Sequence, residues 1–143
     1  MKFTEREICN HLEENISTMF PHIYYFKKEY KYLDGVKCDL LLYAFHKSNE
    51  KYRIPIYTEV KTNKGSSRDL VKELFILKNF VITRQSLPNY PRKAAVILTD
   101  EILNYSTNGV KEFLKQNKNI LVFVITFDNE FDINTMKIER RKL

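Results

Sequence analysis

The sequence predicts an α/β domain in which a mixed central β-sheet is flanked by helices. Two observations carry this prediction. Some segments repeat apolar residues at helical spacing, others form strand-like apolar runs, and the two kinds follow one another along the chain. The chain also has 143 residues, 43% of them hydrophobic, which suffices for a single domain with its own core over residues 1–143.

The first half of the chain predicts one helix followed by three strands. Thr4 and Glu7 form a capping-box pattern, and apolar residues then recur at helical spacing until Pro21 stops the helix. Asp34 and Gly35 supply a tight turn between the first two strands. The three strands are expected at residues 22–32, 36–45 and 54–62.

The second half predicts two more helices and two buried strands. Ser67 can cap a helix from residue 68 to about 80, and a short helix is expected near 110–116. Residues 94–99 and 120–127 are continuous apolar runs, typical of strands buried on both faces. Asp100 and Glu101 fit a helix cap and first turn, and 136–140 fits an edge strand. The predicted order is helix, three strands, helix, strand, helix, strand.

Composition narrows the class of protein. The formal net charge of +6 favours a polyanionic partner such as nucleic acid. Cys9 and Cys38 lack the spacing of a zinc site and the density of a disulfide scaffold, so we expect reduced thiols. No apolar run is long enough to span a bilayer, and the N-terminus lacks a signal-peptide core. We therefore expect a soluble intracellular, cytoplasmic protein that does not enter the membrane.

Three charged residues on the second and third predicted strands stand out. Side chains alternate across a strand, so Glu59 and Lys61 leave the same face while Val60 points the other way. If the strand that carries Asp39 pairs with this one as a hairpin, a second carboxylate joins them. Two acids beside an ammonium form a plausible divalent-metal site for phosphodiester hydrolysis.

The residues around these three resemble a known family. The segments Gly-Val-Lys-Cys-Asp at 35–39 and Thr-Glu-Val-Lys at 58–61 resemble the motifs of the PD-(D/E)XK nuclease superfamily, with Cys38 where the family's name shows proline. The likeness covers roughly residues 1–99. On the first helix, residues 5–12 look like a run found in archaeal Holliday junction resolvase-like members. The resemblance implies a restriction endonuclease-like core.

The resemblance also implies roles for individual residues. Asp39 and Glu59 would ligate one or two Mg²⁺ ions, which Mn²⁺ may replace, with help from the backbone carbonyl of Val60. Glu5 would reach a metal directly or through water. Lys61 would orient or activate the attacking water, either as a base or, if it stays protonated, electrostatically.

Ordinary structural interpretations stand beside these roles. The three residues could be a solvated cross-strand charge cluster, and Glu5 could serve only the dipole of its helix. Glu7 and Glu13 compete with Glu5 as the helix carboxylate. A second Glu-x-Lys at residues 29–31 has neither an Asp strand before it nor a capped helix after it.

The expected partner is nucleic acid, with double-stranded DNA favoured over RNA. Three basic residues after the strand that carries Glu59 and Lys61 could bind phosphates: Lys64, Arg68 and Lys72. An ordinary solvated helix face explains these residues equally well. A homodimer is expected because two chains cut two strands most easily. The alternative is a catalytically silent nucleic-acid-binding module, or a subunit of a larger nuclease or transposition complex, on the same fold.

Overall fold

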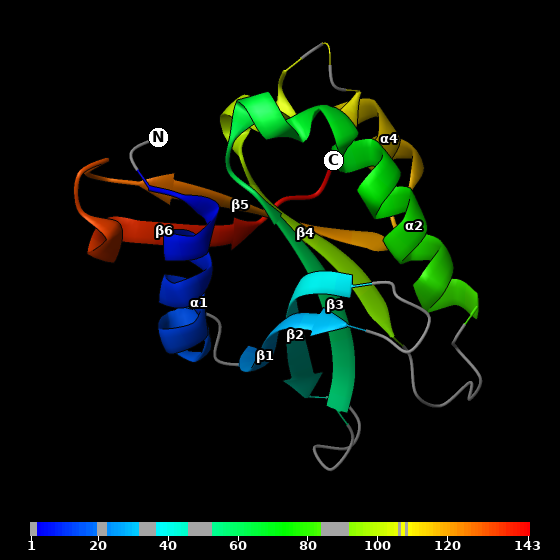
Figure 1. Cartoon of the computed structure of the whole chain (residues 1–143), viewed down its shortest axis with the longest axis horizontal. Helices are drawn as coiled ribbons and strands as arrows, with labels where there is room; N and C mark the ends of the chain where they lie inside the picture. The colour runs from blue at the N-terminus through cyan, green and yellow to red at the C-terminus, as the bar shows by residue number, and fades with distance from the viewer. Residues whose placement is uncertain are drawn as a thin grey trace.

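One six-stranded sheet with helices on both faces forms the centre of the molecule in the computed structural model (Figure 1). The structure describes residues 3–19, 23–31, 37–45, 53–83, 92–105, 107 and 109–143. The strands lie in the sheet in the order in which they occur along the chain, from β1 to β6. The predicted α/β architecture, a mixed sheet flanked by helices, is confirmed.

The elements follow the predicted order, with three short helical elements added. They are α1 (Glu5–Met19), β1 (Ile23–Lys31), β2 (Lys37–Phe45), β3 (Arg53–Lys61), η1 (Lys64–Asp69), α2 (Leu70–Thr83), β4 (Lys93–Thr99), α3 (Asp100–Leu103), α4 (Val110–Gln116), β5 (Ile120–Phe127), η2 (Ile133–Thr135) and β6 (Met136–Arg140). The additions are the short helix α3 and the 3₁₀ turns η1 and η2. Because η1 occupies the start predicted for α2, that helix begins at Leu70 and not at residue 68.

The direction of the strands changes in the middle of the sheet. β1, β2 and β3 form an antiparallel meander, β3, β4 and β5 run parallel, and β6 pairs antiparallel with β5. A parallel pair needs a crossover connection, and a helix usually supplies it. Between β3 and β4 the crossover contains α2, and between β4 and β5 it contains α3 and α4. The meander therefore brings β2 beside β3, and the crossover brings α2 back over the end of β3.

Each face of the sheet has its own core. On the first face the apolar stripe of α1 (Ile8, Leu12, Ile16) packs with Leu40, Val60 and Ile97. On the second face α2, α3 and α4 pack on the sheet (Figure 1). The residues of this second core include Leu41, Tyr57, Leu70, Leu74, Leu77, Val96, Leu98, Ile102 and Leu114. The middle strands β4 and β5 contribute to both cores, as their continuous apolar runs predict.

The predicted capping box starts α1. The Glu7 backbone N–H donates to Thr4 Oγ1 (3.1 Å), and the Thr4 backbone N–H donates to Glu7 Oε1 (3.4 Å). Each residue thus satisfies a backbone donor of the other, as expected at a helix N-terminus. The Glu7 carboxylate is therefore engaged in fixing the helix start.

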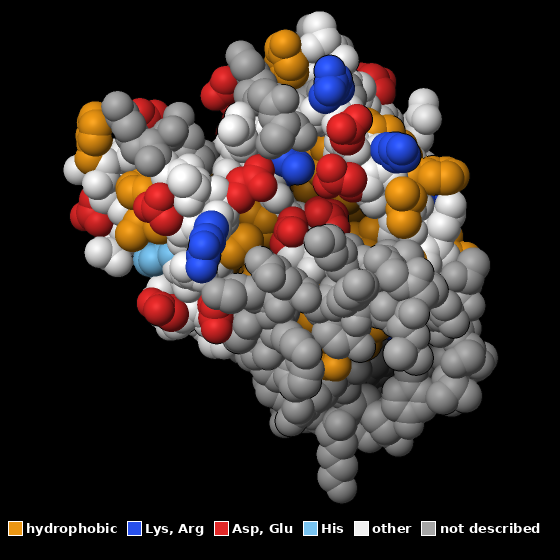
Figure 2. Space-filling model, in the orientation of Figure 1, with side chains coloured by type: hydrophobic (Ala, Val, Ile, Leu, Met, Phe, Trp, Pro, Cys, Tyr) orange, Lys and Arg blue, Asp and Glu red, His pale blue; other side chains and the backbone are white. Residues whose placement is uncertain are grey.

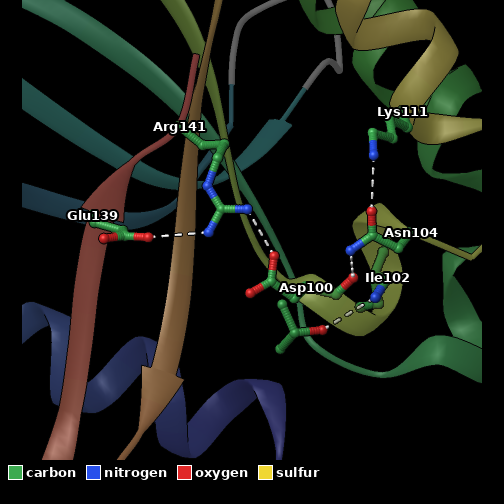
Figure 3. A network of polar contacts seen from close by, with 7 residues as sticks. Asp100, Ile102, Asn104, Lys111, Glu139 and Arg141 are labelled. Atoms are coloured by element: carbon green, nitrogen blue, oxygen red, sulfur yellow. Dashed lines mark hydrogen bonds and ion pairs between the residues drawn. The ribbon is translucent and has the colours of Figure 1, made fainter. Parts of the chain in front are cut away.

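A polar network holds the C-terminal residues against the end of β4 (Figure 3). The Arg141 guanidinium binds Asp100 Oδ1 (2.8 Å) and Glu139 Oε1 (3.0 Å). Thr99 caps α3 by accepting from the Ile102 backbone N–H (3.3 Å), which confirms Asp100 as the start of a helix. On the same turn, Asn104 accepts a hydrogen bond from Lys111 of α4 (3.0 Å). These contacts connect β6, α3 and α4.

No helix in the part of the chain that the structure describes has both the length and the apolar character needed to cross a membrane.

Candidate metal and catalytic site

β2 and β3 separate at the point where the sequence places its acidic residues. Their paired register runs from Phe45 and Arg53 to Leu40 and Thr58 and ends there. Beyond this point the Val60 backbone N–H donates to Asp39 Oδ2, at 2.8 Å. A carboxylate thus takes the place of the strand carbonyl that would otherwise satisfy this amide. The break in the ladder opens the space in which the acidic side chains meet.

Glu59 lies beside Asp39 and is almost fully buried. Only 9% of its surface is exposed. Burial, together with the charge of Asp39 and a hydrogen bond between the two carboxyl groups, raises the pKa of Glu59 to about 9. Near neutral pH, and without a cation, this raised pKa keeps the Glu59 carboxyl group protonated. The structure brings together the two acids that the sequence singles out.

Lys61 leaves the same face of β3 as Glu59, as strand alternation predicts. Its side chain is 12% exposed, and its Nζ lies 3.7 Å from Glu73 Oε2. Lys61 contributes to the electrostatics of Glu59, whose pKa it lowers, but this effect is smaller than the effects that raise that pKa. The predicted trio of Asp39, Glu59 and Lys61 therefore occupies one region of the structure.

Glu73 on α2 is a fourth member of this region, and sequence reasoning missed it. Burial raises the pKa of Glu73, the Lys61 ammonium lowers it, and the Asp39 and Asp69 carboxylates raise it further. A signal was available in the sequence. At 100° per residue, position 73 lies within about 60° of Leu70 and Leu77, so a carboxylate stands on the inward stripe of the helix that follows Glu-x-Lys.

The Val60 backbone is turned toward the same space. In a strand, the N–H and C=O of one residue leave the same edge, because antiparallel partners exchange both bonds. Since the Val60 N–H reaches Asp39, the Val60 carbonyl also faces the β2 side. The carboxyl groups of Asp39 and Glu59 lie together, and the Val60 carbonyl leaves β3 at the same edge as the amide that binds Asp39.

Glu5 is placed differently from the other predicted residues. Its Oε1 accepts from the backbone N–H groups of Thr62 (3.1 Å) and Asn63 (3.4 Å), just after β3. α1 packs on the opposite face of the sheet from Glu59, and Glu5 is not among the charges that shift the pKa of Glu59. The structure therefore gives Glu5 an anchoring contact and does not join it to the carboxyl pair. Contact with a metal through water stays a prediction.

Substitution of Glu5 separates these two roles. Glu5→Ala leaves the Thr62 amide, which lies in a residue only 6% exposed, without its acceptor, and we expect a loss of about 1–3 kcal/mol in the free energy of unfolding. Glu5→Gln keeps an acceptor oxygen and should lose less than about 1 kcal/mol. Chemical denaturation measures both. A tenfold loss of Mn²⁺ affinity in Glu5→Gln would show that Glu5 helps to bind a metal in addition to anchoring the residues after β3.

The remaining predicted residues lie at the edges of the site. Glu7 is used in the helix cap, and Glu13 is half-buried on α1. Arg68 on η1 and Lys72 on α2 are exposed, so both are accessible to a phosphate backbone. The side chain of Lys64 and those of the second Glu-x-Lys at 29–31 lie outside the described side chains.

Acidic side chains gather beside lysine and arginine near the middle of one face of the molecule (Figure 2). Among the residues that the structure describes, no three His, Cys, Asp or Glu side chains are grouped closely enough to form a ready metal cluster. Two carboxyl groups and a carbonyl are nevertheless hard oxygen donors of the kind that Mg²⁺ prefers, and Mg²⁺ commonly keeps several waters in its shell. A cation that replaces the proton of the buried Glu59 would also balance the negative charge of the two carboxylates. The residues present fit such an ion.

The fold and the site together define an α/β protein with two juxtaposed carboxyl groups, a neighbouring lysine and a second glutamate at the separation of two strands. Comparison of the chain with models of protein families and with curated proteins finds no match.

Proposed function

We propose that the protein is a metal-dependent nuclease that hydrolyses phosphodiester bonds, with DNA as the preferred substrate. The observation that carries this proposal is the pairing of the buried Glu59 with the half-buried Asp39, with Lys61 on the same face of the same strand as Glu59. Buried carboxyl groups cost free energy unless they have a function or a counter-ion. A divalent cation between the two acids supplies both.

The proposed ion is Mg²⁺, for which Mn²⁺ can substitute. Asp39, Glu59 and the Val60 carbonyl would hold it: the two carboxyl groups lie together, and the Val60 amide beside this carbonyl binds Asp39. When bound, such an ion lowers the pKa of a coordinated water and stabilises negative charge on a phosphate. Lys61 would orient the attacking water and favour the charge that develops on the phosphate oxygens.

The topology supports a restriction endonuclease-like core. α1 precedes a meander of three antiparallel strands, and a helical crossover then leads to a parallel strand. In this arrangement Asp39 lies on the second strand and Glu59 and Lys61 lie at the end of the third. The order of elements and the positions of these residues agree with the family that the motifs resemble.

Charge supports nucleic acid as the partner. Arg68 and Lys72 are exposed next to the site, and Lys64 precedes them in the chain. Two further hollows, of about 240 Å³ and 120 Å³, lie where β4 and β5 begin, and none of the described residues that line them is acidic. Basic residues line both: Lys118, Arg140, Arg141 and Lys142 in the larger and Lys78, Arg92 and Lys93 in the smaller. This distribution suits a polyanionic backbone.

A homodimer is part of the proposal, because a duplex has two strands and each chain offers one site. Exposed apolar side chains on α2 support a second copy as a partner. Phe75, Ile76 and Ile82 are 52%, 44% and 51% exposed. A single-chain mass in light scattering, with and without DNA, would contradict the dimer.

A cleavage assay tests the proposed activity. Supercoiled plasmid and linear duplex should be cut with Mg²⁺ or Mn²⁺, and a chelator should prevent cutting. Asp39→Asn keeps the size of the side chain but removes an anionic ligand, so we expect the rate to fall by about 10²–10³-fold. Asp128→Asn, which removes an exposed carboxylate paired with Lys137 on the β6 side, is the matched control and should cut normally.

The outcome also separates the nuclease from a module that only binds. Binding of duplex that depends steeply on salt, without cutting under any metal, would reject the nuclease and favour the silent module. Cutting that persists in both Asp39→Asn and Glu59→Gln would reject the site.

A further inference from the structure

The lysine of the site is held by a residue from another element. Among the described side chains, the ion pair of Lys61 is with Glu73, at 3.7 Å from Nζ to Oε2. Lys61 extends from the end of β3, while Glu73 lies in the first turn of α2. The contact therefore joins the strand to the helix that crosses over it.

This contact solves a physical problem for the lysine. A lysine side chain has about 2 kcal/mol of rotamer entropy, and burying an ammonium to 12% exposure costs free energy unless an ionic partner offsets it. Glu73 provides that partner without belonging to the acid pair. The pair is long, at 3.7 Å, and an ammonium has three N–H donors, so contact with one carboxylate leaves donors over for a water or a phosphate oxygen.

We propose that Glu73 is a positioning residue of the site: it holds the Lys61 ammonium beside the Asp39–Glu59 pair while leaving its N–H donors to the reacting groups. The inference rests on the proposed nuclease function. Glu73 is well suited to this role because its helix is fixed by the buried residues Leu70, Leu74 and Leu77. A carboxylate on such a fixed helix can hold the flexible lysine side chain in a more defined position than solvent could.

A double-mutant cycle tests the proposal. We expect Glu73→Gln to lower the single-turnover cleavage rate about tenfold at saturating duplex, with little change in the duplex concentration needed for half the maximal rate. Lys61→Ala should lower the rate about 10²–10³-fold. If Glu73 acts through Lys61, the double variant should be no slower than Lys61→Ala, within about twofold.

Two controls keep the result specific. Glu112→Gln breaks a similar glutamate–lysine pair on α4, in which Lys115 lies 3.8 Å away, and should cut at the normal rate. Mn²⁺ affinity, measured without DNA, should change less than about threefold in Glu73→Gln, because the proposal does not make Glu73 a ligand. A tenfold loss of Mn²⁺ affinity, additive losses in the double variant, or an unchanged rate in Glu73→Gln would each overturn the proposal.

A second measurement separates this inference from the proposed function. Brief acetylation followed by mass spectrometry reports how readily the Lys61 amine reacts. Glu73→Gln should speed modification of Lys61 severalfold, because the amine loses the anion that restrains it. If the wild-type protein does not cut DNA, the nuclease proposal fails while this measurement still decides whether Glu73 restrains Lys61. An unchanged acetylation rate would reject the restraint.

Discussion

Replacing Glu59 by glutamine is expected to stabilise the metal-free protein while it removes cleavage. Glu59 is buried beside Asp39, and its pKa of about 9 means that the folded state resists its ionisation. At pH 7.5 the unfolded chain ionises this carboxyl freely, which favours unfolding. Glutamine is neutral in both states and should therefore raise the free energy of unfolding, by up to about 4 kcal/mol at pH 7.5. Loss of a metal ligand should lower cleavage about a thousandfold.

Both effects can be measured on the same preparation. Urea denaturation with a chelator present gives the free energy of unfolding, and plasmid nicking with Mg²⁺ gives the activity. Glu112→Gln, on the exposed surface of α4, serves as the matched control and should change neither. A variant of Glu59 that is less stable and still cuts would show that this carboxyl group supports the fold and not the chemistry.

The stability of the metal-free protein is expected to fall as the pH rises from about 5 to 9. The folded-state pKa of Glu59 is raised, so the stability is fully present below the ordinary value near 4.5 and is lost as the pH rises toward about 9. One proton of difference between the folded and unfolded states sets a limiting slope of about 1.4 kcal/mol per pH unit. Between pH 6 and 8, where nearly the full slope applies, we expect a loss of about 2–3 kcal/mol.

A divalent cation should reverse this dependence. Binding requires the ionised carboxylates, so it competes with protons and strengthens as the pH rises. Saturating Mg²⁺ should therefore raise the unfolding temperature more at pH 8 than at pH 6. In Glu59→Gln we expect neither the fall in stability with rising pH in the absence of metal nor the rise in unfolding temperature with Mg²⁺. A wild-type profile as flat as that of Glu59→Gln would mean that the pKa of Glu59 is not raised in the folded protein.

Local patterns were sufficient for most of the fold. The capping box of Thr4 and Glu7 marks the start of α1, and the continuous apolar runs identify β4 and β5. Strand alternation was also sufficient to put Glu59 and Lys61 on one face. Each of these features depends on residues close in sequence, whose geometry repeats in every helix or strand.

The parts that the sequence did not predict depend on how distant elements pack. Glu73 meets Lys61 only because α2 folds back over the end of β3, and its position on the helix stripe does not reveal which strand residue it faces. The contact of Glu5 with the amides after β3 likewise depends on how α1 packs on the sheet. The start of α2 was misplaced because a 3₁₀ turn, with no clear pattern of its own, precedes it.

The amide of Val60 has an unusual position for a residue in a sheet, because it points to a carboxylate and not to a strand carbonyl. Its nuclear magnetic resonance frequency should therefore respond when the Asp39 oxygen gains a proton or another ligand, since a bond to a charged acceptor differs from one to a neutral acceptor. A ¹⁵N-labelled sample of the unaltered protein thus carries a built-in spectroscopic probe. That probe would follow ion uptake at the strand junction without any mutation or added dye.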